Sequence, residues 1–368
     1  MAGVEDARAV RPGAATRPHP VKVLQLIHSN EAGGVEALAA SIARGLATHG
    51  VTIETRFLYP AFAVGQWTKI RGILAAIREI VVRRPDVLIA YQSTASVLCG
   101  VVGWLCRVPV RIVHQTAVPG EVNPIVRALD KWAGSCGFYS INIANSHATV
   151  EAFAGYPLSY RAGLTLIEHG LEPPASRTSR AATLSRFAIP DQGSLLFSAG
   201  RLSDQKAQDV VIKALAMLPG MRLIVAGGGP NAAAYMALAR EAGVADRTHL
   251  LGYVSRDDVG DLLAAADVFV FPSRWETFGL APMEAAMTGV PVVASNLAVL
   301  QEVLNVDGQP CATFVTGEDP AHWAQAIAAV TRSADSRSCA TARAPLLRAK
   351  YGHDRMLDAY VRLITAPV

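Results

Sequence analysis

Two long series of short apolar segments, each segment followed by a stretch with helical periodicity, constrain the fold of this chain more than any other feature. The first series starts with "VKVLQLIHS" (21–29) and continues through "PDVLIAYQ", "VPVRIVHQT" and "INIANSH". Between the first two strands, apolar residues recur at helical spacing, as at Val35, Leu38, Ile42 and Leu46. Apolar strands that alternate with helices predict a parallel, doubly wound sheet.

The alternation is interrupted once and then starts again. Residues 171–193 hold three prolines and few apolar runs, and "SLLFSAG" then opens a second series of strands and helices. This predicts an α/β protein of two Rossmann-like domains, at 21–172 and 194–348, joined by a linker at 173–193 and facing each other across a ligand-binding cleft. An amphipathic helix within 349–368 is expected to pack back towards the N-terminal domain. Residues 1–20 lack an apolar run and are expected to form a flexible tail, not a signal peptide.

The composition agrees with a globular protein that has a large core. About half of the 368 residues are apolar and 17% are charged. The five cysteines are odd in number and include no C-x-x-C pair, which favours a reduced, cytoplasmic setting. The longest apolar stretch, near residues 95–106, is shorter than the roughly 20 residues that a bilayer span requires. We therefore expect a soluble protein or one that is peripheral at the inner face of the membrane.

Polar and glycine-rich loops follow the strands of the second series, where ligands bind in doubly wound sheets. "SAGRLSDQKAQD" supplies Arg201 and Lys206. "AGGGPN" contains Gly228, and "GYVSRDD" contains Val254. Two cations beside a helix start suit an anion such as a diphosphate.

The segment "PSRWETFGLAPMEAAMTG" (272–289) carries two carboxylates, Glu276 and Glu284, eight positions apart. Gly279 permits close approach of a ligand to the backbone, and Pro282 suits the first turn of a helix. The amides of residues 278–280 can then point at phosphate oxygens. Since carboxylates repel phosphate, Glu276 and Glu284 are expected to bind the neighbouring hydroxyls of a sugar and a ribose.

Each of these features also has a simpler interpretation. Ser273 and Glu276 have the spacing of a capping box, and Glu284 would suit the positive end of a helix dipole. Arg201 and Lys206 could be solvated surface charges, and "AGGGP" a plain turn. The position of all of them at strand ends favours a shared ligand site.

Several motifs resemble those of retaining GT-B-fold glycosyltransferases of family 4, the group 1 type. "PSRWETFGLAPMEAAMTGVPVVAS" looks like their E-x₇-E signature, and "AGRLSDQKAQDVVIKAL" looks like their G-R-L-x-x-x-K segment. "LIVAGGGP", "LLGYVSRDDVGDLLAAADVFVFPS" and the more loosely matching "NEAGGVEALAASIARGLATHG" occur in the same order as in the family. The resemblance covers roughly residues 21–301 and implies a GT-B fold.

The resemblance also implies roles for individual residues. Catalytic roles would fall to His114, which would be directed at the transferred sugar, to Glu276 on the donor sugar, and to Arg201 and Lys206 on the diphosphate. The donor would further be bound by Gly228, Val254, Phe278, Gly279, Leu280 and, at the ribose, Glu284. Gly33 and Gly34 would approach from the acceptor side. The simpler interpretation of His114 is a polar residue that ends a strand, and His169-Gly170 departs from the Asn-Gly that is frequent in the family.

The implied function is transfer, with retention, of a hexose-type sugar from a UDP- or GDP-sugar to a hydroxyl of a glycan, glycolipid or lipid-linked acceptor in cell-surface glycoconjugate biosynthesis. Since no Asp-x-Asp motif marks a strand end, we expect no metal and no other cofactor, and we expect no nucleic-acid partner. Two alternatives remain open at this point: a sugar-nucleotide epimerase on the same fold, and a non-catalytic relative that binds a sugar nucleotide.

One further segment, "GQWTKIRGILAAIREIVVRRPD" (65–86), predicts a basic amphipathic helix. Such a helix can lie weakly on an anionic membrane surface, or its apolar stripe can pack on the sheet while the cations are solvated. The stripe consists of Trp67, Ile70, Ile73, Leu74, Ile77, Ile80 and Val81, and the cations are Lys69, Arg71, Arg78, Arg83 and Arg84.

Overall fold

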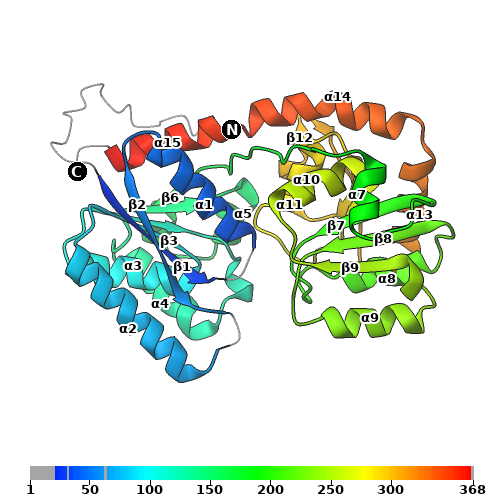
Figure 1. Cartoon of the computed structure of the whole chain (residues 1–368). Helices are drawn as coiled ribbons and strands as arrows, with labels where there is room; N and C mark the ends of the chain where they lie inside the picture. Colours follow the sequence, from blue (N-terminus) through cyan, green and yellow to red (C-terminus); the bar gives the residue numbers. More distant parts are fainter. Residues whose placement is uncertain (1–20, 31–32, 62–63, 366–368) are drawn as a thin grey trace.

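The computed structural model describes residues 21–30, 33–61 and 64–365 as two α/β domains that lie side by side (Figure 1). The predicted tail, residues 1–20, lies outside the described residues. Each domain contains a six-stranded parallel sheet, so the predicted doubly wound architecture is confirmed. The N-terminal sheet has the order β2 (Thr52–Tyr59), β1 (Lys22–Ser29), β3 (Val87–Tyr91), β4 (Val110–His114), β5 (Ile141–Ala144), β6 (Leu164–Leu166).

Helices cover both faces of the N-terminal sheet, because the side chains of its central strands are buried on both sides. In β1, Val23 and Ile27 belong to one core cluster and Leu24 and Leu26 to the other, as the two-residue period of a strand requires. The first cluster is covered by α1 (Gly34–Ala47) and α15 (His353–Thr365). The second is covered by α2 (Gln66–Arg83), α3 (Ser93–Leu105) and α4 (Pro124–Ser135). Short helices α5 (His147–Ala152) and α6 (Leu158–Arg161) complete the domain.

The C-terminal sheet has the same two-faced construction. Its order is β14 (Thr313–Val315), β11 (Val292–Ser295), β10 (Val268–Phe271), β7 (Ser194–Ala199), β8 (Met221–Ala226), β9 (Thr248–Gly252). One face packs against α10 (Arg256–Ala265), α11 (Leu280–Met287) and α12 (Ala298–Val303). The other packs against α8 (Gln208–Leu215), α9 (Ala232–Glu241) and α13 (Pro320–Arg332). A two-stranded ribbon, β12 (Asn305–Val306) with β13 (Gln309–Pro310), lies outside this sheet.

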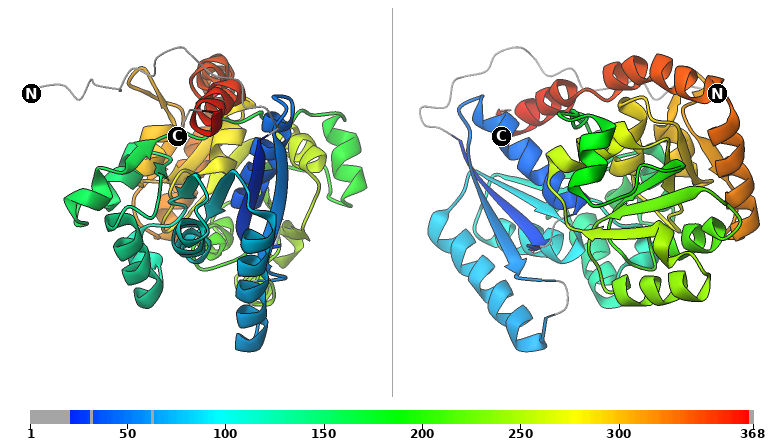
Figure 2. Two further views of the ribbon diagram at one scale, coloured as in Figure 1. Left: turned by 90° about the vertical axis from the view of Figure 1, so that its left-hand side faces the viewer. Right: turned by 45° about the vertical axis from the view of Figure 1, so that its right-hand side comes forward.

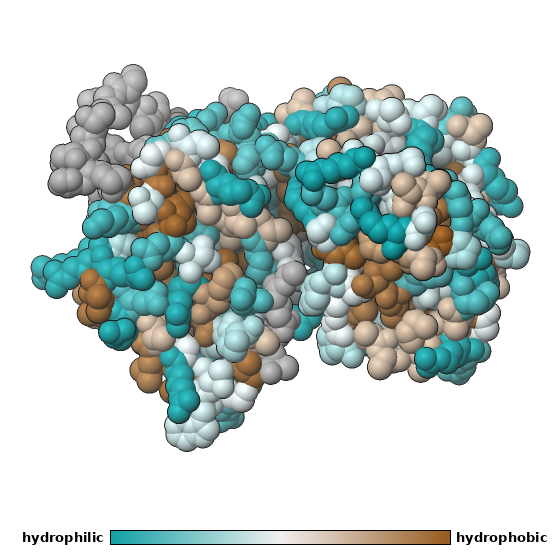
Figure 3. Space-filling model, viewed as in Figure 1, coloured by the Kyte–Doolittle hydropathy of each residue, from teal (hydrophilic) through white to brown (hydrophobic). Residues whose placement is uncertain are grey.

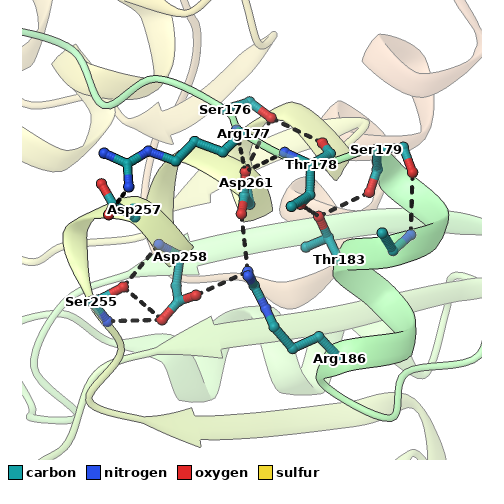
Figure 4. Close-up of polar contacts among 11 residues, drawn as sticks. Ser176, Arg177, Thr178, Ser179, Thr183, Arg186, Ser255, Asp257, Asp258 and Asp261 are labelled. Atoms are coloured by element: carbon teal, nitrogen blue, oxygen red, sulfur yellow. Dashed lines mark hydrogen bonds and ion pairs between the residues drawn. The ribbon is translucent and has the colours of Figure 1, made fainter.

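The linker between the domains is fixed to the C-terminal domain through Asp261 of α10. The Asp261 carboxylate is buried and accepts hydrogen bonds from the amides of Arg177 and Thr178, at 2.6 and 3.0 Å, and from the guanidinium of Arg186 at 3.1 Å (Figure 4). Arg186 ends the short helix α7 (Arg180–Arg186), which confirms the predicted connecting helix. Burial alone would raise the pKa of Asp261, but these hydrogen bonds lower it to about 2.

The chain returns to the N-terminal domain at its end. Helix α14 (Asp335–Lys350) runs along the C-terminal domain, and α15 continues from it onto the N-terminal domain (Figures 1 and 2). Met356, Tyr360 and Ile364 of α15 enter the same core cluster as β1 and α1. Helix α15 therefore contributes to the first domain of the chain although it follows the second.

The two domains meet through loops and helices at the carboxyl ends of their strands, and the surface is indented where they meet (Figure 3). Helix α5, which follows β5, lies against the loop that follows β10. Glu302 of α12 accepts hydrogen bonds from the first two amides of α5, at 2.7 and 2.8 Å. The carboxyl ends of both sheets thus face the same interdomain space, which is where ligands bind in doubly wound folds.

Candidate functional site

Three glycine-containing loops, after β7, β8 and β9, lie side by side at the site and are joined by backbone hydrogen bonds. The amide of Leu202 donates to Gly228 O at 2.9 Å, and the amide of Gly227 donates to Gly252 O at 2.7 Å. Gly227 has φ +138°, and a Cβ atom there would lie 2.1 Å from Gly200 O. Only glycine allows this approach. The segment "AGGGP" therefore packs its backbone against the loops that follow β7 and β9, and it is not a plain turn.

Lys206, from the loop after β7, and Glu276, from the loop after β10, are in contact. Lys206 Nζ contacts Glu276 Oε1 and lies 4.9 Å from the centre of the Phe271 ring. The two side chains are 19% and 8% exposed, so neither is a freely solvated surface charge. Arg201, in the same loop as Lys206, is half-buried.

The capping-box interpretation of Glu276 is wrong. A capping box would require a helix to begin directly after Ser273. The next described helix, α11, begins only at Leu280. The Ser273 hydroxyl is buried without a hydrogen-bond partner among the described residues. The carboxylate of Glu276 therefore serves the cation and not a helix end.

The start of α11 presents unpaired amides, as the sequence predicts. Gly279 precedes the helix with φ +91°, and its carbonyl accepts from the amide of Met283. Within the described part of the chain, the amides of Phe278, Gly279 and Leu280 form no hydrogen bond. Free amides at a helix start favour an anion.

Glu284, one turn into α11, pairs with a residue that the sequence analysis did not select. Arg256 Nη1 lies 2.9 Å from Glu284 Oε1, and Arg256 also donates to Glu172 O, directly before the linker. Burial raises the pKa of Glu284, and the Arg256 cation opposes this effect. The available signal was the arginine in "GYVSRDD", two positions after Val254, at the end of β9.

The glycine loop of the N-terminal domain reaches the same helix start. Gly33 precedes α1, and a Cβ on Gly34 would lie 3.0 Å from Leu280 Cδ1. The first loop of one domain and the start of α11 in the other are therefore in contact across the cleft. The structure brings Gly33, Gly34, Leu280, Glu276 and Lys206 to the same interdomain region.

His114 is the last residue of β4, at the carboxyl end of the N-terminal sheet. It is 2% exposed, and its ring stacks between Tyr91 (ring centres 4.5 Å apart) and Tyr360 (5.7 Å). The Tyr360 hydroxyl is 3.0 Å from His114 Nε2. Burial lowers the pKa of His114 well below its ordinary value. Helix α15 covers the ring at the end of this buried strand, and the role of His114 at the transferred sugar stays a prediction.

Metal ligands do not gather near these residues or elsewhere in the described ranges. Among residues 21–30, 33–61 and 64–365, no group of three or more His, Cys, Asp or Glu side chains could hold a metal ion. The charged groups that meet in the cleft are Lys206 with Glu276 and Arg256 with Glu284.

Comparison with known proteins shows which family the C-terminal domain resembles. Residues 180–345 match the family described as glycosyl transferases group 1. The C-terminal domain of this chain is therefore similar to glycosyl transferases group 1. The resemblance seen in the sequence is thereby confirmed, and the matched residues include Arg201, Lys206, Glu276 and Glu284.

Curated relatives of the group 1 domain include two D-inositol 3-phosphate glycosyltransferases. That of Xylanimonas cellulosilytica is 36% identical over 200 residues, which are 51% of this chain and 47% of the relative. That of Mycolicibacterium smegmatis is 30% identical over 237 residues, covering 61% of this chain and 53% of the relative. The aligned parts thus amount to about half the length of these relatives.

Solved structures show that the group 1 domain sits in a GT-B fold. HepE of Anabaena, solved in complex with UDP and glucose, superposes with a TM-score of 0.79 at 20% identity, covering 94% of this chain and all of that one. Sucrose-phosphate synthase of Thermosynechococcus elongatus gives a TM-score of 0.78 at 17% identity with the same coverage. The GT-B expectation is confirmed for the fold.

Proposed function

We propose that this protein is a retaining glycosyltransferase that moves a hexose-type sugar from a UDP- or GDP-sugar to a hydroxyl group of a glycan, glycolipid or lipid-linked acceptor. The observation that most supports this proposal is the contact of Lys206 with Glu276 in the same interdomain region as the unpaired amides at the start of α11. The Gly33-Gly34 loop lies opposite these amides. The similar fold of HepE, solved with UDP-glucose, supports a nucleotide-sugar donor. Cell-surface polysaccharide or glycoconjugate biosynthesis would be the setting.

In this proposal the donor diphosphate lies at the start of α11. Arg201, Lys206 and the amides of residues 278–280 stabilise the charge that develops on the leaving phosphate. Glu284 binds the ribose hydroxyls, and Arg256 holds its carboxylate in place at 2.9 Å. Glu276 binds the donor sugar, while its contact with Lys206 links the sugar and phosphate subsites.

Retention would follow from attack on the face that the leaving group occupies. Glu276, the carboxylate assigned to the donor sugar, pairs with Lys206, and we assign no residue the role of covalent nucleophile. The departing diphosphate would accept the proton of the acceptor hydroxyl as that oxygen bonds to the anomeric carbon. A trapped glycosyl-enzyme adduct would contradict this route.

The experiment that tests the function is a donor screen followed by product analysis. We expect UDP- or GDP-sugars to raise the melting temperature, and the preferred donor to yield a glycosylated acceptor plus a nucleoside diphosphate. Conversion of the sugar nucleotide without any acceptor would instead indicate an epimerase. Binding without turnover of any donor and acceptor pair would indicate a non-catalytic relative.

Metal independence is a separate proposal. Cations and helix amides would replace a metal ion at the diphosphate, so incubation with EDTA should leave turnover within about twofold. Loss of turnover that Mg²⁺ or Mn²⁺ restores would refute this part of the proposal.

The last part of the proposal is that the N-terminal domain associates weakly with an anionic membrane. Of the predicted stripe on α2, only Ile80 is fully buried, whereas Trp67, Ile70, Leu74 and Val81 are 46–78% exposed. The alternative that the stripe packs on the sheet therefore holds only for part of it, around Ile80. Of the helices in the described ranges, none has both the length and the apolarity of a membrane span.

A vesicle co-sedimentation assay tests this association. Each exposed cation near the surface would contribute about 1 kcal/mol, so binding to anionic vesicles should be visible at low salt and lost at high salt. Reversing Lys69, Arg71 and Arg78 to Glu should abolish it; Arg83 is spared because it donates to Glu54 at 2.7 Å. Arg240→Glu on α9 is the matched control in the other domain. Equal sedimentation with anionic and neutral vesicles would favour a soluble acceptor.

A further inference from the structure

The peptide group between Thr277 and Phe278, inside the E-x₇-E segment, is held from the opposite domain. Ser146 Oγ lies 3.0 Å from Thr277 O, and Thr149 Oγ1 lies 3.1 Å from it. Both hydroxyls belong to the start of α5, and both are buried together with Thr277. Two N-terminal-domain hydroxyl groups therefore converge on one carbonyl of the C-terminal domain.

A hydrogen-bonded chain extends this contact to the side chain on the other end of the same peptide. Thr149 Oγ1 is also 2.9 Å from Asn145 Oδ1, so its one hydrogen is shared between that oxygen and Thr277 O. Asn145 Nδ2 is 3.1 Å from His169 Nε2. The His169 ring in turn packs edge-on against the Phe278 ring, with centres 4.9 Å apart. Burial lowers the pKa of His169 to about 3, so the ring is neutral.

The geometry of a trans peptide gives this arrangement a consequence for the site. The carbonyl and the following N–H of a planar trans peptide point in opposite directions, and no described peptide bond is cis. Since the Thr277 carbonyl points at α5, the Phe278 N–H points away from it. That amide has no acceptor among the described residues.

We propose that Ser146 and Thr149 are positioning residues that orient the Phe278 amide for the donor diphosphate. The inference rests on the proposed function, because it takes the amides before α11 as phosphate donors. Without the two hydroxyls, the Thr277–Phe278 peptide could rotate, and nucleotide binding would have to order it again. With them, the nucleotide site of one domain is fixed by the other.

The same interface supplies a matched control. Glu302 holds α5 through the amides of His147 and Ala148 at 2.7 and 2.8 Å, and these contacts do not involve Thr277. Glu302→Gln should loosen the contact between the domains while both hydroxyl groups remain on the Thr277 carbonyl. This variant therefore distinguishes loss of orientation of the Thr277–Phe278 peptide from a general weakening of the contact between the two domains.

The test measures binding of UDP and GDP by calorimetry, together with donor KM, acceptor KM and melting temperature. Ser146→Ala/Thr149→Val should weaken nucleotide binding about five- to tenfold and raise donor KM similarly, with acceptor KM unchanged. Thr149→Ser keeps the hydroxyl and should bind within about twofold of the unaltered protein. Glu302→Gln should lower the melting temperature yet also bind within about twofold.

Three results would overturn the inference. One is unchanged nucleotide affinity in the double variant, and another is an equal loss in Glu302→Gln. If the double variant does not fold, Thr149→Val alone, which keeps the Ser146 cap of α5, is compared with Thr149→Ser, and equal affinities of these two are the third. If the unaltered protein binds neither UDP nor GDP, the proposed function itself fails, and this inference fails with it.

Discussion

The ion pair between Lys206 and Glu276 allows stability and catalysis to be separated in one experiment. We consider Lys206→Met, which keeps an apolar stem next to the Phe271 ring but removes the charge. The Glu276 carboxylate, 8% exposed, then loses its cation. In the double variant Lys206→Met/Glu276→Gln, the second position is neutral as well.

The magnitude follows from the burial of the pair. Removing one partner of a fully buried ion pair costs about 3 kcal/mol or more, because the other charge stays in a poorly solvated site. The Lys206–Glu276 pair is partly exposed, so we expect a cost of about 2 kcal/mol. For a domain of this size, each kcal/mol lowers the melting temperature by about 2–4 °C. Lys206→Met should therefore melt about 4–8 °C lower, whereas the neutral double variant should regain most of this difference.

Catalysis should respond differently. Because the cation stabilises the leaving diphosphate, Lys206→Met should lower kcat/KM by about 10²-fold, and the double variant should not regain it. The assay combines thermal unfolding with steady-state kinetics on the donor identified in the screen. Glu276→Gln alone completes the double-mutant cycle and gives the coupling free energy of the pair.

Two outcomes would refute the reasoning. If the double variant is as unstable as Lys206→Met, the instability does not come from an unpaired carboxylate. If the double variant recovers turnover together with stability, the lysine matters for folding only, and the assignment of the diphosphate to Lys206 fails.

Two further predictions concern carboxylates that the structure places in different roles. Glu284→Ala should raise donor KM about tenfold with little change in kcat, because ribose contacts act equally in the ground and transition states; an unchanged KM would leave Glu284 with only a helix-dipole role. Asp261 has a pKa of about 2, below its ordinary value of 3.8, so its charge stabilises the fold above about pH 4, and this contribution is lost as the pH falls towards 2. Asp261→Asn should therefore lower the free energy of unfolding at pH 7 by about 2–3 kcal/mol, as measured by urea denaturation. The difference between the variant and the unaltered protein should shrink as the pH approaches 2. A difference independent of pH would show that the carboxylate charge is not what anchors the linker.

Local patterns were enough to predict much of this protein. The alternation of buried strands and amphipathic helices gave the two doubly wound sheets, and the prolines of 171–193 gave the boundary between them. Loops such as those of Gly228 and Gly279 could be assigned to the ligand site, because the carboxyl ends of parallel strands share one edge of a sheet. Segments 296–350, with short strands and a helix that contains Pro345, gave no comparable pattern.

The partners of the charged residues were decided by tertiary structure alone. Lys206 and Glu276 are 70 residues apart, and the sequence offered Glu276 an alternative partner in its own neighbourhood, the capping box at Ser273. Arg256 was missed because nothing near it in the sequence indicates that Glu284 lies within 2.9 Å. Which charges pair depends on how loops from different strands pack, and a one-dimensional pattern does not contain that information.

His114 shows the same limit most clearly. Its place at the end of a strand was visible in the sequence, and that position alone is compatible with a ligand contact or with a core residue. Its burial depends on Tyr360, 246 residues later, whose hydroxyl lies 3.0 Å from His114 Nε2 as α15 packs on the N-terminal sheet, and its role at the transferred sugar stays a prediction. Strand and helix periodicity follow from local backbone geometry, so the sequence determined them; burial of a given side chain depends on which remote segment covers it, so only the folded chain decided it.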